Sequence, residues 1–365
     1  MPSAKVHRIS AAGPDDVDGI ENAITAGRID PGGIVAIFGK TEGNGCVNDF
    51  TRGYATQSLG LMLHRLLPRE RAGEVCLVMS GGTEGGMAPH WVVFERCEDS
   101  EGEGPALALG RSHTAALPAE HLGRLEQVDQ VAAGVRAAMA AASIEKMSDV
   151  HFVQIKCPLL TAQRIAEADN RGARVATRDT LKSMGLSRAA SALGIAVALG
   201  EVQRANLSDD AIGADFEMWS GRASCSAGIE LRNHEIVVLG MSRSWSGSLA
   251  IGHAVMADAI DTEPVRAVLQ GLGIAANGQL SAGERNRVVA VLAKAEASHD
   301  GLLRGHRHTM LDDSDISPTR HARAFVCGAL AGVFGHAEIY VSGGAEHQGP
   351  DGGGPVALIV DRHRL

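Results

Sequence analysis

Three serines in the sequence begin the same short pattern, Ser-[Gly/Ala]-Gly-x-Glu. They are Ser80 in "LVMSGGTEGG", Ser226 in "ASCSAGIE" and Ser342 in "YVSGGAEHQG". Each serine ends an apolar run and precedes a small-residue turn, so its hydroxyl would lie beside exposed backbone N–H groups. Such amides stabilise a developing oxyanion, typically by about 3 kcal/mol for one donor. The pattern therefore predicts an oxyanion-binding turn in three copies.

A lysine ends an apolar, strand-like run upstream of each serine. These lysines are Lys40 after "IVAIFG", Lys156 after "HFVQI" and Lys294 after "VVAVLA". A serine hydroxyl is a poor nucleophile unless a base lies beside it. Lysine can be that base when burial or a neighbouring cation lowers its pKa towards neutrality. A lysine at the end of an apolar strand is therefore a candidate for a lowered pKa.

A Ser/Thr-Arg pair begins an Ala/Leu-rich helical pattern between each lysine and serine. The arginines are Arg52 in "TRGYATQSLGLML", Arg188 in "SRAASALGIAVAL" and Arg320 in "TRHARAFVCGALAGV". A guanidinium group provides a rigid fork of donors for carbonyl oxygens. Arg323 is a second candidate for the third arginine, but alignment of the repeats favours Arg320.

The same order of elements thus occurs three times: helix, strand ending in lysine, arginine helix, strand ending in serine, strand. The helices that begin the units are predicted in "DDVDGIENAITAGRI", "QVDQVAAGVRAAMAAASI" and "TEPVRAVLQGLGI", and the last strands in "HWVVFE", "EIVVLG" and "PVALIV". We expect an α/β fold of three homologous units, residues 1–104, 112–250 and 255–365, with boundaries in the segments 97–105 and 253–264. A pseudo-threefold axis would bring the lysines, arginines and serines together around a small ring with carbonyls at threefold positions.

Composition excludes several other classes of protein. The 365 residues carry a net charge of −9 without a basic stripe, and only 3% are aromatic, so nucleic acid and anionic membranes are not expected partners. The six cysteines form no Cys-x-x-Cys pair, which argues against a zinc knuckle or a disulfide framework. No apolar run is long enough to span a membrane, and "MPSAKVHRIS" lacks the apolar core of a signal peptide, so a cytoplasmic protein is expected.

Three short motifs match signatures of other classes of protein, but the sequence around them does not support those functions. "GKT" at 39–41 resembles the end of a phosphate loop, yet the preceding "IVAIF" is strand-like. "SIEK" at 143–146 matches Ser-x-x-Lys of penicillin-recognising enzymes without a Lys-Thr-Gly partner. "HRH" at 306–308, with Asp312 and Asp313, could belong to a metal-dependent amidohydrolase, but a solvated polar loop is the better explanation.

Taken together, the long motifs resemble the cyanuric acid hydrolase/barbiturase family. They include "MSGGTEGGMAPHW", "ATRDTLKSMGLSRAASALG", "LGMSRSWSGSLAIGHAVMADAID", "HRHTMLDDSDI" and "VSGGAEHQGPDGGGPVA", and the resemblance covers essentially the whole chain. It implies three α/β units whose strands form a central β-barrel with helices outside, and hydrolysis of a cyclic amide by a Ser-Lys dyad. No organic cofactor and no catalytic metal are expected.

Carried over residue by residue, the resemblance places the dyad in the middle unit, on Lys156 and Ser226. The implied substrate-binding residues are Arg52, Ser80, Gly81, Arg188, Ser226, Ala227, Arg320, Ser342 and Gly343, with Lys40 and Lys294 as additional pocket donors. A structural Mg²⁺ or Ca²⁺ is implied near the third serine turn. Its ligands would come from Glu296, Ala345, Gln348, Gly349, Pro350 and Gly353. A homotetramer is also implied.

Several functions remain open at this stage. The resemblance implies ring opening of cyanuric acid to carboxybiuret, which would lose CO₂ to give biuret. Barbiturase, which would open barbituric acid to ureidomalonate, differs by one carbon for one ring nitrogen, and composition cannot separate the two. A non-catalytic protein that binds a small ring, and a metal-dependent amidohydrolase, are further alternatives.

Overall fold

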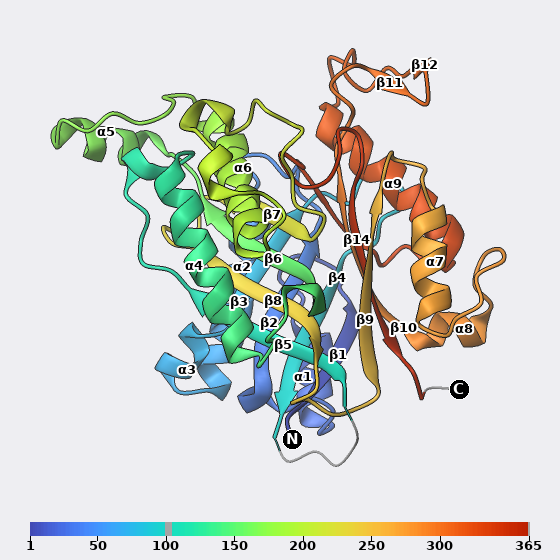
Figure 1. The fold of residues 1–365 in the computed structure, drawn as a ribbon. Helices are drawn as coiled ribbons and strands as arrows, with labels where there is room; N and C mark the ends of the chain where they lie inside the picture. Colours follow the sequence, from blue (N-terminus) through green and yellow to red (C-terminus); the bar gives the residue numbers. More distant parts are fainter. Residues whose placement is uncertain (99–103, 364–365) are drawn as a thin grey trace.

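The computed structural model describes residues 1–98 and 104–363. It contains three four-stranded sheets with the same strand order (Figure 1). The first is β1 (Ser3–Ser10), β4 (His90–Cys97), β2 (Ile34–Thr41) and β3 (Cys76–Gly81). The second is β5 (Ala106–His113), β8 (Glu235–Ser242), β6 (Val150–Pro158) and β7 (Ala223–Gly228). The third is β9 (Leu249–Met256), β14 (Gly354–Asp361), β10 (Val288–Ala295) and β13 (Tyr340–Gly343).

Strand register is also the same in the three sheets. The lysine strand runs parallel to the serine strand, and the pairs in register are Lys40 with Ser80, Lys156 with Ser226 and Lys294 with Ser342. Each lysine strand also pairs antiparallel with the C-terminal strand of its unit, which is β4, β8 or β14. In all three pairs the register shifts near the start of the lysine strand. Because pairing and irregularity both recur, we infer that the three units are related by a pseudo-threefold axis.

Helices cover the outer faces of the sheets (Figure 1). The first sheet is accompanied by α1 (Asp18–Thr25), α2 (Phe50–Leu66) and α3 (Arg69–Gly73), and the second by α4 (Leu125–Ala141), α5 (Ala162–Asn170) and α6 (Thr180–Ala198). The third is accompanied by α7 (Glu263–Gly271), α8 (Ala282–Arg287) and α9 (Pro318–Phe334), and by the hairpin β11 (Leu302–Leu303) and β12 (His306–Arg307). No helix in the described ranges is long and apolar enough to cross a membrane.

One apolar core is shared by all three sheets. Phe38 of the first sheet, Ile155 of the second and Tyr340 of the third belong to the same buried cluster. The rings of Phe38 and Tyr340 lie 5.7 Å apart, centroid to centroid. The sheets therefore meet at the centre of the molecule. Within the described residues, however, their hydrogen bonding forms three separate sheets, so a closed central barrel is not established.

Most of the predicted segments form the expected elements, with two differences. The first strand of each sheet, β1, β5 or β9, was not predicted, and β5 and β9 begin at Ala106 and Leu249, before the unit boundaries expected at 112 and 255. Part of the predicted boundary at 97–105 lies outside the described residues.

Helix α6 begins at Thr180, because the Asp179 side chain accepts a hydrogen bond from the Lys182 N–H. Arg188 therefore lies within this helix and not at its start.

Close packing of α4 on β5 can be tested at Gly110. A Cβ atom there would lie 1.9 Å from the Ala138 carbonyl oxygen, which is backbone and cannot move aside. We expect Gly110→Ala to lower the free energy of unfolding by about 3 kcal/mol in urea titrations. Gly60→Ala is the control, since its Cβ would contact nothing within 4 Å in α2. That variant should gain about 0.5–1 kcal/mol, and equal effects of both changes would contradict the packing argument.

Candidate active site

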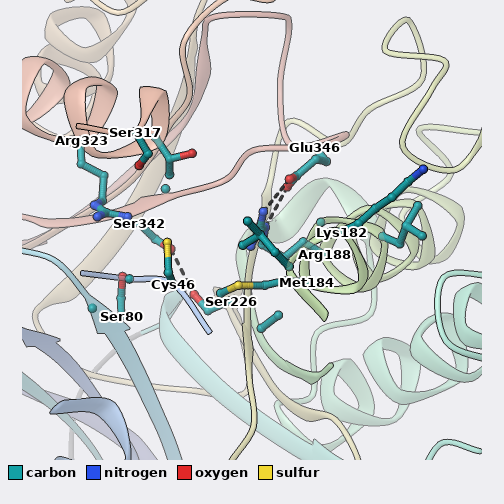
Figure 2. A pocket seen from close by; sticks show the side chains of 18 of the residues that line it. Cys46, Ser80, Lys182, Met184, Arg188, Ser226, Ser317, Arg323, Ser342 and Glu346 are labelled. Atoms are coloured by element: carbon teal, nitrogen blue, oxygen red, sulfur yellow. Dashed lines mark hydrogen bonds and ion pairs between the residues drawn. The ribbon is translucent and has the colours of Figure 1, made fainter. Parts of the chain in front are cut away.

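The three serine turns meet at one cavity of about 550 Å³. Its lining combines residues of all three units, and Figure 2 shows side chains from each unit pointing towards the same space. The lining includes the three turn serines Ser80, Ser226 and Ser342, the arginines Arg52, Arg188 and Arg323, and the further hydroxyl residues Ser317 and Thr319. The predicted backbone contributors Gly81, Ala227 and Gly343 also line it. The structure thus places the predicted serines around a common centre.

The three lysines lie beneath the serines and are almost completely buried. The Lys40 ammonium donates to Ser80 Oγ at 3.2 Å and to the Gly81 carbonyl at 3.4 Å. Lys294 donates to Ser342 Oγ at 3.2 Å and to the Gly343 carbonyl at 3.2 Å. The first and third units therefore each contain a hydrogen-bonded lysine–serine pair.

The middle unit is arranged differently. Lys156 donates to the Met79 carbonyl at 2.9 Å and forms an ion pair with Glu230 at 2.7 Å. None of its hydrogen bonds in the described structure reaches Ser226 Oγ, although Lys156 and Ser226 are in register on neighbouring strands. Ser226 Oγ instead shares a hydrogen bond of 3.1 Å with Ser342 Oγ (Figure 2). The predicted dyad is thus close in the fold but not hydrogen-bonded in this structure.

Burial lowers the pKa of all three lysines. The pKa of Lys294 falls to about 7, because burial and then the Arg188 charge disfavour its protonated form. Burial and then Arg323 hold the pKa of Lys40 well below its ordinary value. Burial also lowers the pKa of Lys156, but the neighbouring Glu230 carboxylate opposes that shift. The ion pair therefore favours the protonated form of Lys156 while Glu230 remains in contact.

Two of the pocket arginines are held by a glutamate from another unit. Arg188 donates from Nε and Nη2 to the two carboxylate oxygens of Glu346, at 2.8 and 2.5 Å (Figure 2). Arg323 donates in the same way to Glu84, at 2.9 and 2.5 Å. Such paired bonds fix the plane of the guanidinium group. The glutamates are the last residues of the serine pattern, and their positioning role was missed although they were part of that pattern.

Arg323, and not Arg320, is the pocket arginine of the third unit. Its side chain is 3% exposed and lines the cavity, whereas Arg320 is 35% exposed, does not line the cavity and contacts Glu84 at 3.1 Å. The two residues are one turn apart on α9, so both reach the same carboxylate. Aligning the Thr-Arg pairs of the repeats selected the outer one, because helix position relative to the pocket is not visible in the sequence.

Residues of the predicted cation site surround the loop after Ser342. Glu296 accepts hydrogen bonds from the Ala297 N–H and the Thr319 hydroxyl, but it forms no ion pair within the described residues. Burial and then the Glu346 charge raise its pKa. The Gln348 side-chain oxygen is already used, since it accepts from the Cys225 N–H at 2.6 Å. A buried carboxylate that forms no ion pair within the described residues, although the Arg188 and Lys294 charges lower its pKa, suits a hard divalent cation.

Other possible metal donors lie away from the cavity. The donor atoms of Cys76, His113 and Glu235 lie within 4.8 Å of one another, but none of the three residues lines the cavity. Around the "HRH" motif, Asp312 contacts Arg307 and Asp313 contacts His321. These local pairs agree with a polar loop and leave a metal-dependent amidohydrolase without support from the geometry.

A pocket that combines serines, underlying buried lysines and arginines from three repeated units has the groups expected of a hydrolase site. The family model described as amidohydrolase ring-opening protein matches residues 5–361. The chain belongs to this family, whose members hydrolyse C–N bonds of cyclic amides.

Its relatives include two cyanuric acid amidohydrolases. The protein from Azorhizobium caulinodans is 66% identical and the one from Bradyrhizobium is 62% identical, and in each comparison 98–99% of both chains is covered. The crystal structure of the Azorhizobium enzyme matches with a TM-score of 0.92 over 99% of this chain and 100% of the other. A second cyanuric acid hydrolase, described as an evolutionary innovation by structural concatenation, matches at 49% identity with a TM-score of 0.93 and the same coverage.

Replacing each of the two α9 arginines will show which one binds substrate. Arg323→Ala removes a buried guanidinium group from the cavity, so kcat/KM for a cyclic amide should fall by about 10- to 100-fold. Arg320→Ala removes a half-exposed ion pair and should cost about fivefold or less. Steady-state kinetics of both variants make the comparison. A larger loss in Arg320→Ala would restore the assignment made from the sequence.

Proposed function

We propose that this protein is a cyanuric acid amidohydrolase that opens the s-triazine ring with a serine nucleophile. The observation that carries the proposal is the convergence of three serines and three arginines, one of each from every unit, on one cavity. Cyanuric acid has three carbonyl groups at threefold positions, so each unit can serve one of them. The activity of the two relatives named above supports the same substrate.

The proposed chemistry begins at Ser226. Neutral Lys156 takes the proton of Ser226 as Oγ attacks a ring carbonyl, and backbone amides of the turn together with an arginine stabilise the oxyanion. The ring C–N bond breaks with transfer of a proton to its nitrogen, and water then hydrolyses the acyl-enzyme. The released carboxybiuret loses CO₂ to give biuret. Burial and the Arg52 charge disfavour protonation of Lys156.

Arginine and serine have separate tasks in this proposal. Arg188 and Arg323, held in fixed planes by Glu346 and Glu84, provide donors for ring carbonyls. The Ser226–Ser342 hydrogen bond keeps the nucleophile close to the third unit. Ala227 replaces the glycine found after the other two serines, which fits a distinct role for the middle turn.

A divalent cation is proposed at the loop after Ser342, held by Glu296 and by carbonyls of Ala345, Gln348, Gly349, Pro350 and Gly353. Bound there, it would neutralise a buried carboxylate and fix the loop, without taking part in the reaction. The homotetramer and the cytoplasmic location implied by the resemblance remain predictions.

Turnover of cyanuric acid by the purified protein is the direct test of function. We expect loss of ring absorbance and formation of biuret, with slower turnover of barbituric acid in parallel assays. Ser226→Ala should lower kcat by about 10⁴-fold or more, because in the proposed mechanism Ser226 alone forms the acyl-enzyme. Ser80→Ala and Ser342→Ala are matched controls and should retain more activity than Ser226→Ala. Faster turnover of barbituric acid would favour barbiturase, and ring binding without hydrolysis would favour a binding protein.

Chelation separates a structural cation from a catalytic one. EDTA should lower the Tm by at least about 2 °C, because the Glu296 charge loses its partner, while the initial rate measured at once at 25 °C persists. Added Mg²⁺ or Ca²⁺ should restore the Tm. In Glu296→Gln the Tm should no longer respond to EDTA. Immediate loss of all activity on chelation would point to a metal-dependent amidohydrolase.

A further inference from the structure

The three glutamates of the serine turns form an almost cyclic set of contacts between units. Glu84 of the first unit holds Arg323 of the third, and Glu346 of the third holds Arg188 of the second. The same rule assigns Glu230 of the second unit to Arg52 of the first. This third contact is the one that is missing, because Glu230 is paired with Lys156.

The arginine of the missing contact has a buried donor without a hydrogen bond. In the two complete pairs the arginine Nε donates to the glutamate. The Nε of Arg52 is buried and lacks a hydrogen bond, with the Asp49 carboxylate 4.0 Å away, while the Oε1 of Glu230 lies 2.7 Å from the Lys156 ammonium. Arg52 instead donates from its other nitrogens to the carbonyls of Gly45, Cys46 and Ala227. A buried donor without a hydrogen bond, next to the place where the other two units have a glutamate, indicates that a second arrangement is available to Arg52 and Glu230.

The turn itself allows two arrangements. Gly82 and Gly344, which follow the first and third serines by two residues, have positive φ angles of 100° and 76°. Gly228 is not in that conformation, and a Cβ atom there would lie 2.0 Å from Glu230 Oε2. Glycine tolerates both backbone conformations. The middle turn can therefore adopt the form of the other two, which would carry Glu230 towards Arg52.

We propose that Glu230 is a positioning residue that exchanges Lys156 for Arg52 when a ring fills the cavity, and so releases the lysine for its reaction with Ser226. Before the exchange, Glu230 is ionised and Lys156 carries its proton. Afterwards Lys156 lacks an ion pair and gives this proton to solvent. The neutral amine then accepts the Ser226 proton. This inference rests on the proposed function, since it takes Lys156 as the base.

The charges around Lys156 determine how strongly the exchange acts. Glu230 and Arg52 are the nearest, Cys157 adjoins it on the same strand, and Glu235 is its partner on β8. Moving the Glu230 carboxylate to Arg52 removes the closest negative charge from Lys156 and neutralises the closest arginine. An opposite charge at contact distance changes a pKa by about 1–3 units. The exchange therefore lowers the pKa of Lys156 further and favours its neutral form.

Kinetics as a function of pH test the proposal, because kcat/KM reports groups of the free enzyme and kcat those of the complex. In the native protein the pKa of the catalytic base should be higher in the pH profile of kcat/KM than in the pH profile of kcat. In Glu230→Gln the pKa values obtained from kcat/KM and from kcat should coincide, because the pKa obtained from kcat/KM falls by about 1 unit or more. Glu84→Gln is the matched control at the equivalent position. This variant should raise KM because it releases Arg323. The difference between the pKa values from kcat/KM and from kcat should remain as in the native protein.

A crystal structure of Ser226→Ala with cyanuric acid bound provides a readout independent of turnover. We expect the Glu230 carboxylate about 2.8 Å from Arg52 Nε, and Lys156 without a carboxylate partner. The exchange is refuted if Glu230 still contacts Lys156 in that complex, or if Glu230→Gln keeps the native difference between the pKa values from kcat/KM and from kcat. If the native protein does not hydrolyse cyanuric acid, the proposed function fails, and the crystal structure alone then decides whether Glu230 moves.

Discussion

Burial of three lysine ammonium groups at one centre is the constraint on which this structure depends. A buried charge is strongly unfavourable unless hydrogen bonds replace its water. Here the replacements are backbone carbonyls at the strand ends, including that of Met79 for Lys156 and that of Cys225 for Lys294. Both carbonyls belong to the neighbouring sheet. Lys156 and Lys294 are therefore accommodated only where two sheets meet at their serine ends, whereas Lys40 is bonded to Ser80 and Gly81 of its own sheet.

The same dependence on a neighbouring unit holds for the arginines. Arg188 takes its orientation from Glu346 and Arg323 from Glu84, each across a boundary between units. A single unit can pair its lysine with its serine, as in the first and third units, but it cannot supply the glutamates that orient Arg188 and Arg323. The functional site is thus a property of the assembled chain, which explains why the repeat occurs as three joined units with nearly the same register.

Much of this arrangement could be predicted from the sequence, because the informative residues end apolar runs. The register of Lys40 with Ser80 and its two equivalents follows once those runs are parallel strands. The strand β1 was missed, since "SAKVHRIS" mixes polar and apolar residues at a sheet edge where one side needs no partner. The more apolar strands β5 and β9 were missed because each unit was expected to begin with a helix. Arg320 was preferred to Arg323 because sequence spacing does not reveal which turn of α9 faces the cavity. The pairing of Glu230 with Lys156 breaks the repeat, so no repeat-based argument could predict it.

This break has a physical reason on the proposed function. A symmetric ring offers the same carbonyl to every unit, yet only one serine can attack in a cycle. Repulsion between three equivalent lysines would limit how many are protonated, but it would not select which lysine is neutral. A difference in protonation between units must therefore come from the protein. Lys294, with a pKa of about 7, has only carbonyl and hydroxyl partners, whereas Lys156 has a carboxylate that can leave. Control by a movable glutamate gives one unit a base that becomes neutral only when the cavity is filled, while the other two lysines remain tied to their own serines.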